Sequence, residues 1–283
     1  MAKLPGGGWL ERLENLDRRW LFVALAAAIV VPLLVPVPLP LAVTPMVRDL
    51  YDAIERLPEH SIVLVSADYD PSGKPELTPF HVALMRQLAR KKLRVVMVSL
   101  WAPGPPLTEQ VLAEVGYETT LGQKRGVDFV HLGFKEGRQI VMKAMGQSLR
   151  QTFPKDHGGT PVDQIPLMRE VDGYGDFALL IDVSAGNPGV KEYVQVVQSR
   201  YRVKMVGACT AVSGPDYVPY YKAGQLLGLA AGMKGAAEYE KLVGHPGAAT
   251  TGMAAQSASH VLLVAFILFG NVMYFRARRR GDS

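Results

Sequence analysis

The sequence predicts an α/β domain with a mostly parallel β-sheet, held between two membrane-spanning helices. Short apolar runs rich in β-branched residues alternate with longer helical segments between residues 44 and 250, which is typical of βαβ units. Each predicted strand is apolar along almost its whole length, which indicates a sheet covered by helices on both faces. Long apolar stretches also lie near both ends of the 283-residue chain, which predicts the two membrane segments.

The first apolar stretch, residues 20–40, contains no charged residue. About twenty apolar residues suffice to cross the hydrocarbon core of a bilayer, so we predict a transmembrane helix here, preceded by a tail of residues 1–19. A cleaved signal peptide is the alternative, because Arg18 and Arg19 precede the stretch. The stretch is longer than the usual core of a signal peptide and ends in prolines, which favours an uncleaved anchor.

The second membrane segment is predicted at residues 253–275, and a basic tail of residues 276–283 with the sequence "RARRR" follows it. Basic residues therefore flank both predicted spans on the side of the chain ends. By the positive-inside rule, both ends lie in the cytoplasm and residues 44–250 lie outside it. The sequence thus predicts a two-span protein of the inner, or plasma, membrane of a bacterial cell, with the lipid bilayer as its first partner.

Charge and cysteine content exclude several classes of protein. Basic and acidic residues are nearly balanced between the spans, so the pI near 9.2 reflects the tails and gives no support for nucleic-acid binding. Cys209 is the only cysteine and is interpreted as a small buried side chain, so no internal disulfide can form. The six histidines show no ligand spacing, and we predict neither a metal site nor a cofactor.

The extracytoplasmic domain is predicted to begin with an amphipathic helix over residues 45–57, with Thr44 as its N-cap. The predicted strands cover residues 61–67, 93–100, 127–134, 176–185 and 204–212. The predicted helices between them cover residues 78–91, 107–115, 136–152 and 188–200. Residues 154–175 are rich in proline and glycine and form the longest predicted loop, which is either a plain connector or a lid.

Polar residues follow the predicted strands at the points where the strands end. Because the carboxyl ends of parallel strands share one edge of a sheet, where such folds bind their ligands, these residues predict a ligand cleft. Its members are Asp68, Asp70, Ser99, Trp101, Asp182, Ser184, Thr210 and Ser213.

The stretch "SADYDPSG" places Asp68 and Asp70 directly after the first strand. It resembles the first motif of the haloacid dehalogenase-like phosphatases, in which an Asp nucleophile and an Asp acid/base flank a Mg²⁺ site. The resemblance implies a metal-dependent hydrolase, with Asp182 as a later metal ligand and these three aspartates as its catalytic residues. The sequence departs from the motif after Asp70, where Pro-Ser-Gly follows. In the alternative interpretation both aspartates only shape a turn.

The order of strands, loops and helices also resembles the sensor domains of type I periplasmic binding proteins. It is similar as well to the Rossmann-like external domains of uncharacterised two-span bacterial membrane proteins. This likeness concerns the fold and implies a ligand cleft, whereas the function has to be argued from the site itself.

Glycines recur at four-residue intervals in the stretch from Ala223 to Gly244, which would place them on one face of a helix. An internal glycine costs a helix about 0.5–1 kcal/mol relative to alanine, so close packing must offset the cost. The predicted row of glycines could pack against another subunit or against the domain's own sheet, and the sequence does not decide between these two interpretations. The residues of this predicted interface are Gly224, Gly228, Gly232 and Gly235.

From these features we expect a non-catalytic, membrane-anchored component or scaffold of a membrane protein complex. It would assemble through the glycine-rich segment and the membrane helices, either with its own copies or with other subunits. A sensor or binding module for a small ligand is the first alternative, and the metal-dependent hydrolase is the second.

Overall fold

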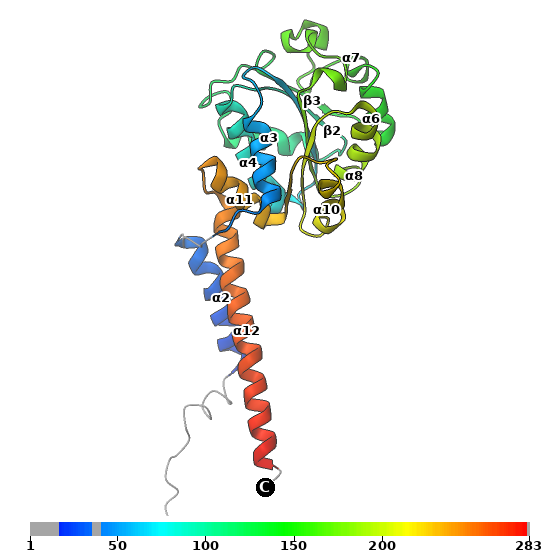
Figure 1. Ribbon diagram of the computed structural model, residues 1–283. Coiled ribbons are helices and arrows are strands. Elements are labelled where there is room, and N and C mark those ends of the chain that lie inside the picture. Colours follow the sequence, from blue (N-terminus) through cyan, green and yellow to red (C-terminus); the bar gives the residue numbers. More distant parts are fainter. Residues whose placement is uncertain (1–16, 36–40, 282–283) are drawn as a thin grey trace, which may run out of the picture. The chain divides into compact units, whose positions relative to one another are not determined.

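The computed structural model describes residues 17–35 and 41–281 (Figure 1). The chain divides into two compact units. Residues 41–250 form the α/β domain, and the other unit holds the apolar helices near the two ends of the chain. The predicted tail of residues 1–19 and the end of the first predicted span lie largely outside the described residues.

The domain is built on a six-stranded sheet with the strand order β3-β2-β1-β4-β5-β6 and parallel pairing throughout. This is the order of a doubly wound, Rossmann-like sheet, in which the order of strand addition reverses between β1 and β4 while all strands stay parallel. The strands are β1 (Ile62–Asp68), β2 (Arg94–Ser99), β3 (Phe129–Phe134), β4 (Leu179–Ser184), β5 (Met205–Cys209) and β6 (Leu229–Ala231).

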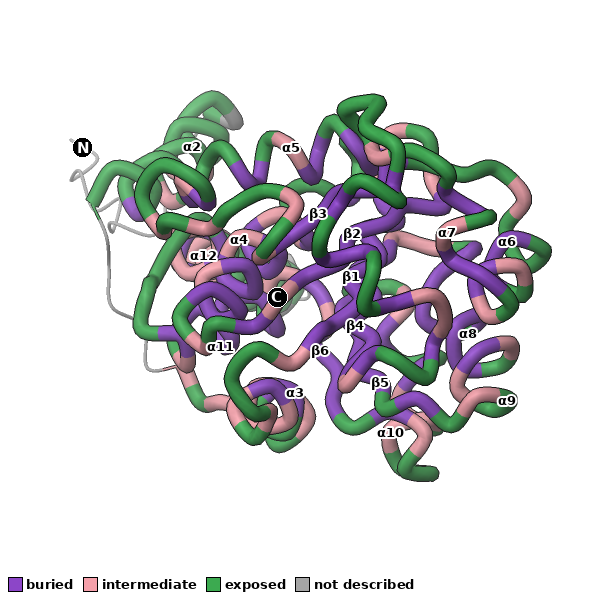
Figure 2. Tube along the Cα trace, turned by 90° about the horizontal axis from the view of Figure 1, so that it is seen from above, coloured by how far each residue is buried: buried purple, intermediate pink, exposed green. Residues whose placement is uncertain are grey.

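Helices cover both faces of the sheet, as the apolar strands predict. All seven residues of β1 and all six of β4 are buried, and Figure 2 shows buried residues along the length of the central strands. One face carries α3 (Pro45–Glu55), α4 (Lys74–Arg90), α5 (Gly104–Glu114) and α11 (Gly232–Val243). The other carries α6 (Gln139–Met145), α7 (Leu149–Thr152), α8 (Val190–Glu192), the π-helical turn η4 (Tyr193–Gln198), α9 (Ser199–Tyr201) and α10 (Gly214–Lys222).

The structure corrects one local prediction and adds detail to two others. The predicted helix over residues 136–152 is broken between α6 and α7, where Gly146 lies so close to Tyr201 that a Cβ would stand 2.2 Å from the phenol oxygen. The loop of residues 154–175 contains three 3₁₀ turns, η1 (Val162–Gln164), η2 (Pro166–Arg169) and η3 (Tyr174–Asp176). Thr44 is the N-cap residue of α3, as predicted, but its hydroxyl makes no capping hydrogen bond and donates instead to Glu238 on α11 at 2.6 Å.

The predicted glycine-rich helix is also wrong in its first half. The chain turns at Gly224, forms the sixth strand β6, and only then enters α11 at Gly232. Gly224 and Gly232 both have positive φ angles, 73° and 63°, which a helix does not allow. The glycines therefore lie in different elements and do not form one helical ridge.

Close approaches inside the domain explain two of these glycines. A Cβ on Gly228 would lie 2.3 Å from the backbone nitrogen of Leu50 in α3. A Cβ on Gly235 would lie 3.0 Å from the backbone of Ala230 in β6. The absence of side chains at these positions lets α3 and α11 pack directly on the edge of the sheet.

Helix α12 (Ala248–Gly281) begins in the domain and continues into the other unit. Its residues from Ala248 to Phe275 make a helix long and apolar enough to cross a membrane. Helix α2 (Arg18–Leu34) is also apolar but shorter, and residues 36–40 of the first predicted span lie outside the described residues. One candidate span is thus present among the described residues, and the first span stays a prediction.

The carboxylate of Glu240 holds the first turn of α12. It accepts hydrogen bonds from the backbone nitrogens of Gly247 (2.9 Å), Ala249 (3.0 Å) and Thr250 (2.8 Å), and from the Thr250 hydroxyl (2.6 Å). A carboxylate at this place satisfies amide groups that have no partner inside the helix and interacts favourably with the helix dipole. The start of the candidate span is thereby fixed to α11.

Candidate functional site at the carboxyl ends of the strands

The eight predicted cleft residues all lie at or just beyond the carboxyl ends of β1, β2, β4 and β5. They do not form one cleft, however. The structure separates them into a buried group under the strand ends, a turn after β1, a cavity wall and a pair beside α10.

The buried group lies between β1 and β4, where the order of the strands reverses. The pairing of these strands places Ser66 opposite Asp182 and Asp68 opposite Ser184, all fully or almost fully buried. Each serine hydroxyl donates to the aspartate on its own strand, at 2.6 Å in both cases. Because these residues alternate with apolar ones, all four side chains point to the same face of the sheet.

The surroundings of the two carboxyl groups in this cluster favour their protonated forms. Burial raises the pKa of Asp68 to about 6, although hydrogen bonds from Ser66 and the backbone of Leu100 oppose the rise. Burial and the nearby charge of Asp68 raise the pKa of Asp182 well above its ordinary value. The pair therefore keeps its protons to a higher pH than two separate, exposed aspartates would.

Neighbouring groups close this pair off from solvent. The phenol of Tyr193 donates to the Ser66 hydroxyl at 2.8 Å, and the backbone nitrogen of Leu100 donates to Asp68. One oxygen of Asp182, Oδ1, is buried without a hydrogen-bond partner among the described residues. Both carboxyl groups are fully buried, and the group holds the loops after β2 and β4 through the backbone nitrogens of Leu100, which donates to Asp68, and Val190, which donates to Ser184.

Asp70 lies apart from this pair, in the turn that leads to α4. Its Oδ1 accepts from the backbone nitrogen of Ser72 at 2.9 Å, from the Ser72 hydroxyl at 2.6 Å and from the backbone nitrogen of Gly73 at 3.3 Å. These bonds lower the pKa of Asp70, with the Ser72 hydroxyl as the largest cause. This is an Asx turn, the arrangement that the alternative interpretation of the sequence describes.

The residues do not fit the Mg²⁺ site that the phosphatase resemblance implies. In residues 17–35 and 41–281 no group of three or more His, Cys, Asp or Glu side chains is placed to hold a metal ion. Asp68 accepts hydrogen bonds from Ser66 and Leu100, Asp182 accepts one from Ser184, and Asp70 is engaged in its own turn.

The turn after β1 does not fit a dinucleotide either. In sheets of this strand order, a glycine-rich turn and the N-terminus of the first helix hold a pyrophosphate. Here Gly73 is the single glycine between β1 and α4, and Glu76 stands in the first turn of the helix, where it accepts from the backbone nitrogen of Ala211 at 2.7 Å. A carboxylate in that position repels an anion.

A cavity of about 280 Å³ opens at the ends of β2, β3 and β4. Its walls come from the β2–α5 loop, the β3–α6 loop and the β4–α8 loop. They are Leu100, Trp101, Ala102, Pro103, Phe134, Glu136, Gly137, Arg138, Asn187 and Pro188. Of the predicted cleft residues, only Trp101 lines this cavity.

Trp101 ties two walls of the cavity together. Its indole nitrogen donates to the backbone oxygen of Pro188 at 2.9 Å, and its backbone nitrogen donates to the Ser99 hydroxyl at 3.1 Å. Ser99 in turn donates to the backbone oxygen of Ala67 at 2.7 Å. Gly104 permits this arrangement, because a Cβ there would stand 2.0 Å from the Ser99 hydroxyl. Ser99 is therefore a buried support of the cavity rather than one of its walls.

The third wall has an unusual backbone. Arg138, which is exposed at the cavity, has a φ of 47° and a ψ of −122°, and Gly137 before it has a φ of 131°. A non-glycine residue in such a conformation carries strain, and strained residues concentrate at binding and catalytic sites. This arginine was not predicted, since no local sequence pattern distinguishes it from other exposed arginines.

Thr210 and Ser213 lie on the other side of the reversal point, between β5 and α10. Their hydroxyls are 3.2 Å apart, and the backbone nitrogen of Ser213 donates to the backbone oxygen of Thr210 at 3.1 Å. Neither residue lines the cavity at β2, β3 and β4. They form the turn that begins α10.

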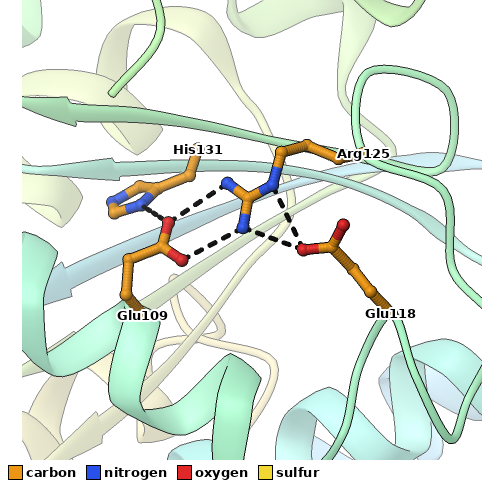
Figure 3. Close-up of polar contacts among 4 residues, drawn as sticks. All are labelled: Glu109, Glu118, Arg125 and His131. Carbon is orange, nitrogen blue, oxygen red and sulfur yellow. Dashed lines mark hydrogen bonds and ion pairs between the residues drawn. The ribbon is translucent and has the colours of Figure 1, made fainter. Parts of the chain in front are cut away.

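A polar network at the edge strand β3 was also missed (Figure 3). The Nδ1 of His131 is 2.8 Å from Glu109 on α5, and the guanidinium of Arg125 bonds both Glu109 and Glu118. The His131 contact is the largest cause that lowers the pKa of Glu109, to about 2, while burial lowers the pKa of His131. The Nε2 of His131 is buried without a hydrogen-bond partner among the described residues, and the network joins α5 to β3. The network residues are far apart in sequence, and no spacing could have predicted them.

The strand order, the cavity and the buried carboxyl pair identify an α/β domain with its open cavity on the β2–β3 side of the reversal point. The glycine fingerprint and the metal-ligand cluster that characterise two large groups of such folds are not present in the described part of the domain. In comparisons with known proteins, no family model, no curated protein and no solved structure matches this chain.

Proposed function

We propose that this chain is a membrane-anchored binding module that takes a small organic molecule in the cavity at the ends of β2, β3 and β4. The observation that carries the proposal is the place of this cavity, next to the point where the strand order reverses, which is where folds of this class bind ligands. The buried carboxyl pair stabilises the loops that form the cavity.

The cavity walls indicate the chemistry of the ligand. Trp101 and Phe134 offer aromatic surface, and Pro103 adds an apolar face. Arg138 is a cation held in a strained conformation, suited to an acidic group, and Asn187 supplies amide hydrogen-bonding groups. The proposed ligand is accordingly a small carboxylate with an aromatic or aliphatic part.

The proposal includes the predicted topology. Both chain ends lie in the cytoplasm, two helices cross the inner membrane, and the α/β domain is on the other side. The apolar character of α2 and α12 and the basic residues at both ends of the sequence support this arrangement.

Ligand binding can be tested on the full-length chain in detergent, with Trp9→Phe and Trp20→Phe substitutions that leave Trp101 as the single tryptophan. We expect aryl or alkyl carboxylates to raise the thermal midpoint and to change the Trp101 fluorescence with saturation. The matching uncharged amides should do neither.

Arg138→Gln should abolish the response to the carboxylates, since it removes the cation of the cavity. The matched control is Arg200→Gln, a change on α9 outside the cavity. If the whole panel leaves both signals unchanged, or if Arg138→Gln responds as the parent chain does, the proposed binding function is wrong.

One observation favours a second role, as a component of a membrane complex. A cavity of about 510 Å³ lies along α2 and α12, and small residues form much of its lining. Small side chains at four-residue spacing let membrane helices approach closely, which suits assembly with other copies of this chain or with other membrane proteins. The lining residues are Ala28, Pro32, Ala254, Ser257, Ala258, Val261, Leu262 and Ala265.

A further inference from the structure

A second cavity in the domain lies on the opposite face of the sheet from α6 and α8, along α4 and α11. Its volume is about 580 Å³, and it shares no lining residue with the cavity at the strand ends. It extends to the first residue of α12, Ala248. The proposed function leaves this cavity unused.

The cavity combines an apolar wall with positive charge. Pro71, Pro75, Pro79, Val82 and Met233 provide the apolar surface. Lys74 and Arg86 provide two cations that lie on the same helix, three turns apart. An apolar wall with cations beside it suits an amphiphilic anion.

Arg86 is the most informative residue of this cavity. It is half-buried, and it makes no hydrogen bond or ion pair with any residue in the described part of the chain. It also lines an adjoining cavity of about 330 Å³, together with Leu121 and Val243. Removing a charge from water without a partner is unfavourable, so such an arginine indicates a binding site for an anion that is not part of this chain.

The acidic residues of the cavity do not neutralise Arg86. The carboxylate of Glu240 is occupied by the first turn of α12, where it accepts four hydrogen bonds. Glu114 is exposed at the end of α5 and forms no ion pair with Arg86. Lys74 donates to the neutral side chain of Gln110 at 3.0 Å, so its charge is also uncompensated.

The position of the cavity along the chain indicates where the anion comes from. Pro246, Gly247 and Ala248 line it, and Ala248 is also the first residue of the candidate span Ala248–Phe275. With a rise of about 1.5 Å per helical residue, this wall lies within a few residues of the lipid headgroups if α12 crosses the membrane.

We propose that this cavity binds an acidic phospholipid, with Arg86 on the phosphate, the proline-rich wall of α4 on the apolar part and Lys74 adding positive charge at the other end of the cavity. The combination of an uncompensated arginine, an apolar wall and the start of the membrane helix favours a lipid over a water-soluble anion. In this proposal the bound lipid links the domain to the bilayer through α4.

Native mass spectrometry of the full-length chain, released from detergent with added lipid, tests the proposal. Phosphatidylglycerol is expected to bind with saturation, and zwitterionic phosphatidylcholine at least tenfold more weakly. Arg86→Gln should lower the affinity for phosphatidylglycerol about tenfold, which corresponds to the loss of one charged contact. A second variant, Val82→Trp, fills the cavity without changing its charge and should also weaken binding.

Two controls keep the outcome specific. Arg200→Gln changes an exposed arginine away from the cavity, and Arg138→Gln changes the cation of the other cavity. Both variants should bind phosphatidylglycerol like the parent chain. Equal binding of phosphatidylcholine, or unaltered binding by folded Arg86→Gln and Val82→Trp, would overturn the lipid site. Displacement of the lipid by millimolar inorganic phosphate would assign the site to a soluble anion instead. Carboxylate binding by Arg138→Gln, measured separately, tests the proposed small-molecule cavity independently of the lipid site.

Discussion

Gly228→Ala is expected to destabilise the α/β domain by about 3 kcal/mol, at the upper end of the usual cost of overpacking a core. The new Cβ would lie 2.3 Å from the nitrogen and 2.4 Å from the Cα of Leu50. Both are backbone atoms of Leu50, a fully buried residue of α3, so no side-chain rotation can relieve the contact. Urea unfolding of the full-length chain in detergent, followed by circular dichroism, measures the loss.

The matched control is Gly175→Ala, because Gly175 is exposed and a Cβ there meets no atom within 4 Å. Its unfolding midpoint should stay close to that of the parent chain. Gly228→Leu separates internal packing from the predicted subunit interface. A folded, inserted and purely monomeric Gly228→Leu protein would support the interface and contradict the packing seen here, which predicts loss of the folded domain.

Raising the pH from about 4 to 8 is expected to lower the free energy of unfolding by at least about 3 kcal/mol, which is the contribution of Asp68 alone to the effect of the buried carboxyl pair. The pKa of Asp68 is about 6 in the folded state against an ordinary value of 3.8, and the pKa of Asp182 is raised further. The folded state therefore keeps protons that the unfolded chain releases above about pH 4. The stabilisation is fully present below the ordinary pKa and is lost as the pH rises through the folded-state values.

Asp182→Asn should remove most of this slope above pH 6, because its amide can donate to Asp68 and accept from Ser184 without a proton to lose. An infrared band of a protonated carboxyl group should be present in the parent domain at pH 7 and absent from the variant. Asp70→Asn is the matched control. The pKa of Asp70 is lowered, so its contribution is lost only as the pH falls into the acid range, and the slope above pH 6 should remain. A parent domain whose stability is flat between pH 4 and 8 would contradict the raised pKa values of the pair.

The class of the fold was predictable because every strand of the sheet except β6 is a mostly apolar segment of five to seven residues. The sixth strand was missed for a physical reason. Leu229–Ala231 is three residues long and lies among glycines whose four-residue spacing imitates a helix face. The positive φ angles at Gly224 and Gly232 decide between strand and helix, and no spacing in the sequence reveals them.

The location of the candidate site was predictable, but most of the residues that form it were not. The rule that ligands bind at the carboxyl ends of parallel strands located the correct edge of the sheet, and it identified Trp101. It could not show that Asp68 and Asp182 face each other across β1 and β4, because their register depends on the sheet pairing. Arg138 was missed because its significance lies in its unusual backbone, and Arg86 because its significance lies in its lack of a partner. Only the three-dimensional structure shows these features.

The orientation of the domain is the claim on which the proposed function depends, and cysteine labelling of intact cells measures it directly. Cys209 is buried and burial raises the pKa of its thiol, so it should not react, whereas Val212 on the surface is 89% exposed. We expect a membrane-impermeant maleimide to label Val212→Cys on intact cells and Ser283→Cys only after permeabilisation. Labelling of Val212→Cys only in permeabilised cells would place the domain in the cytoplasm and contradict the account.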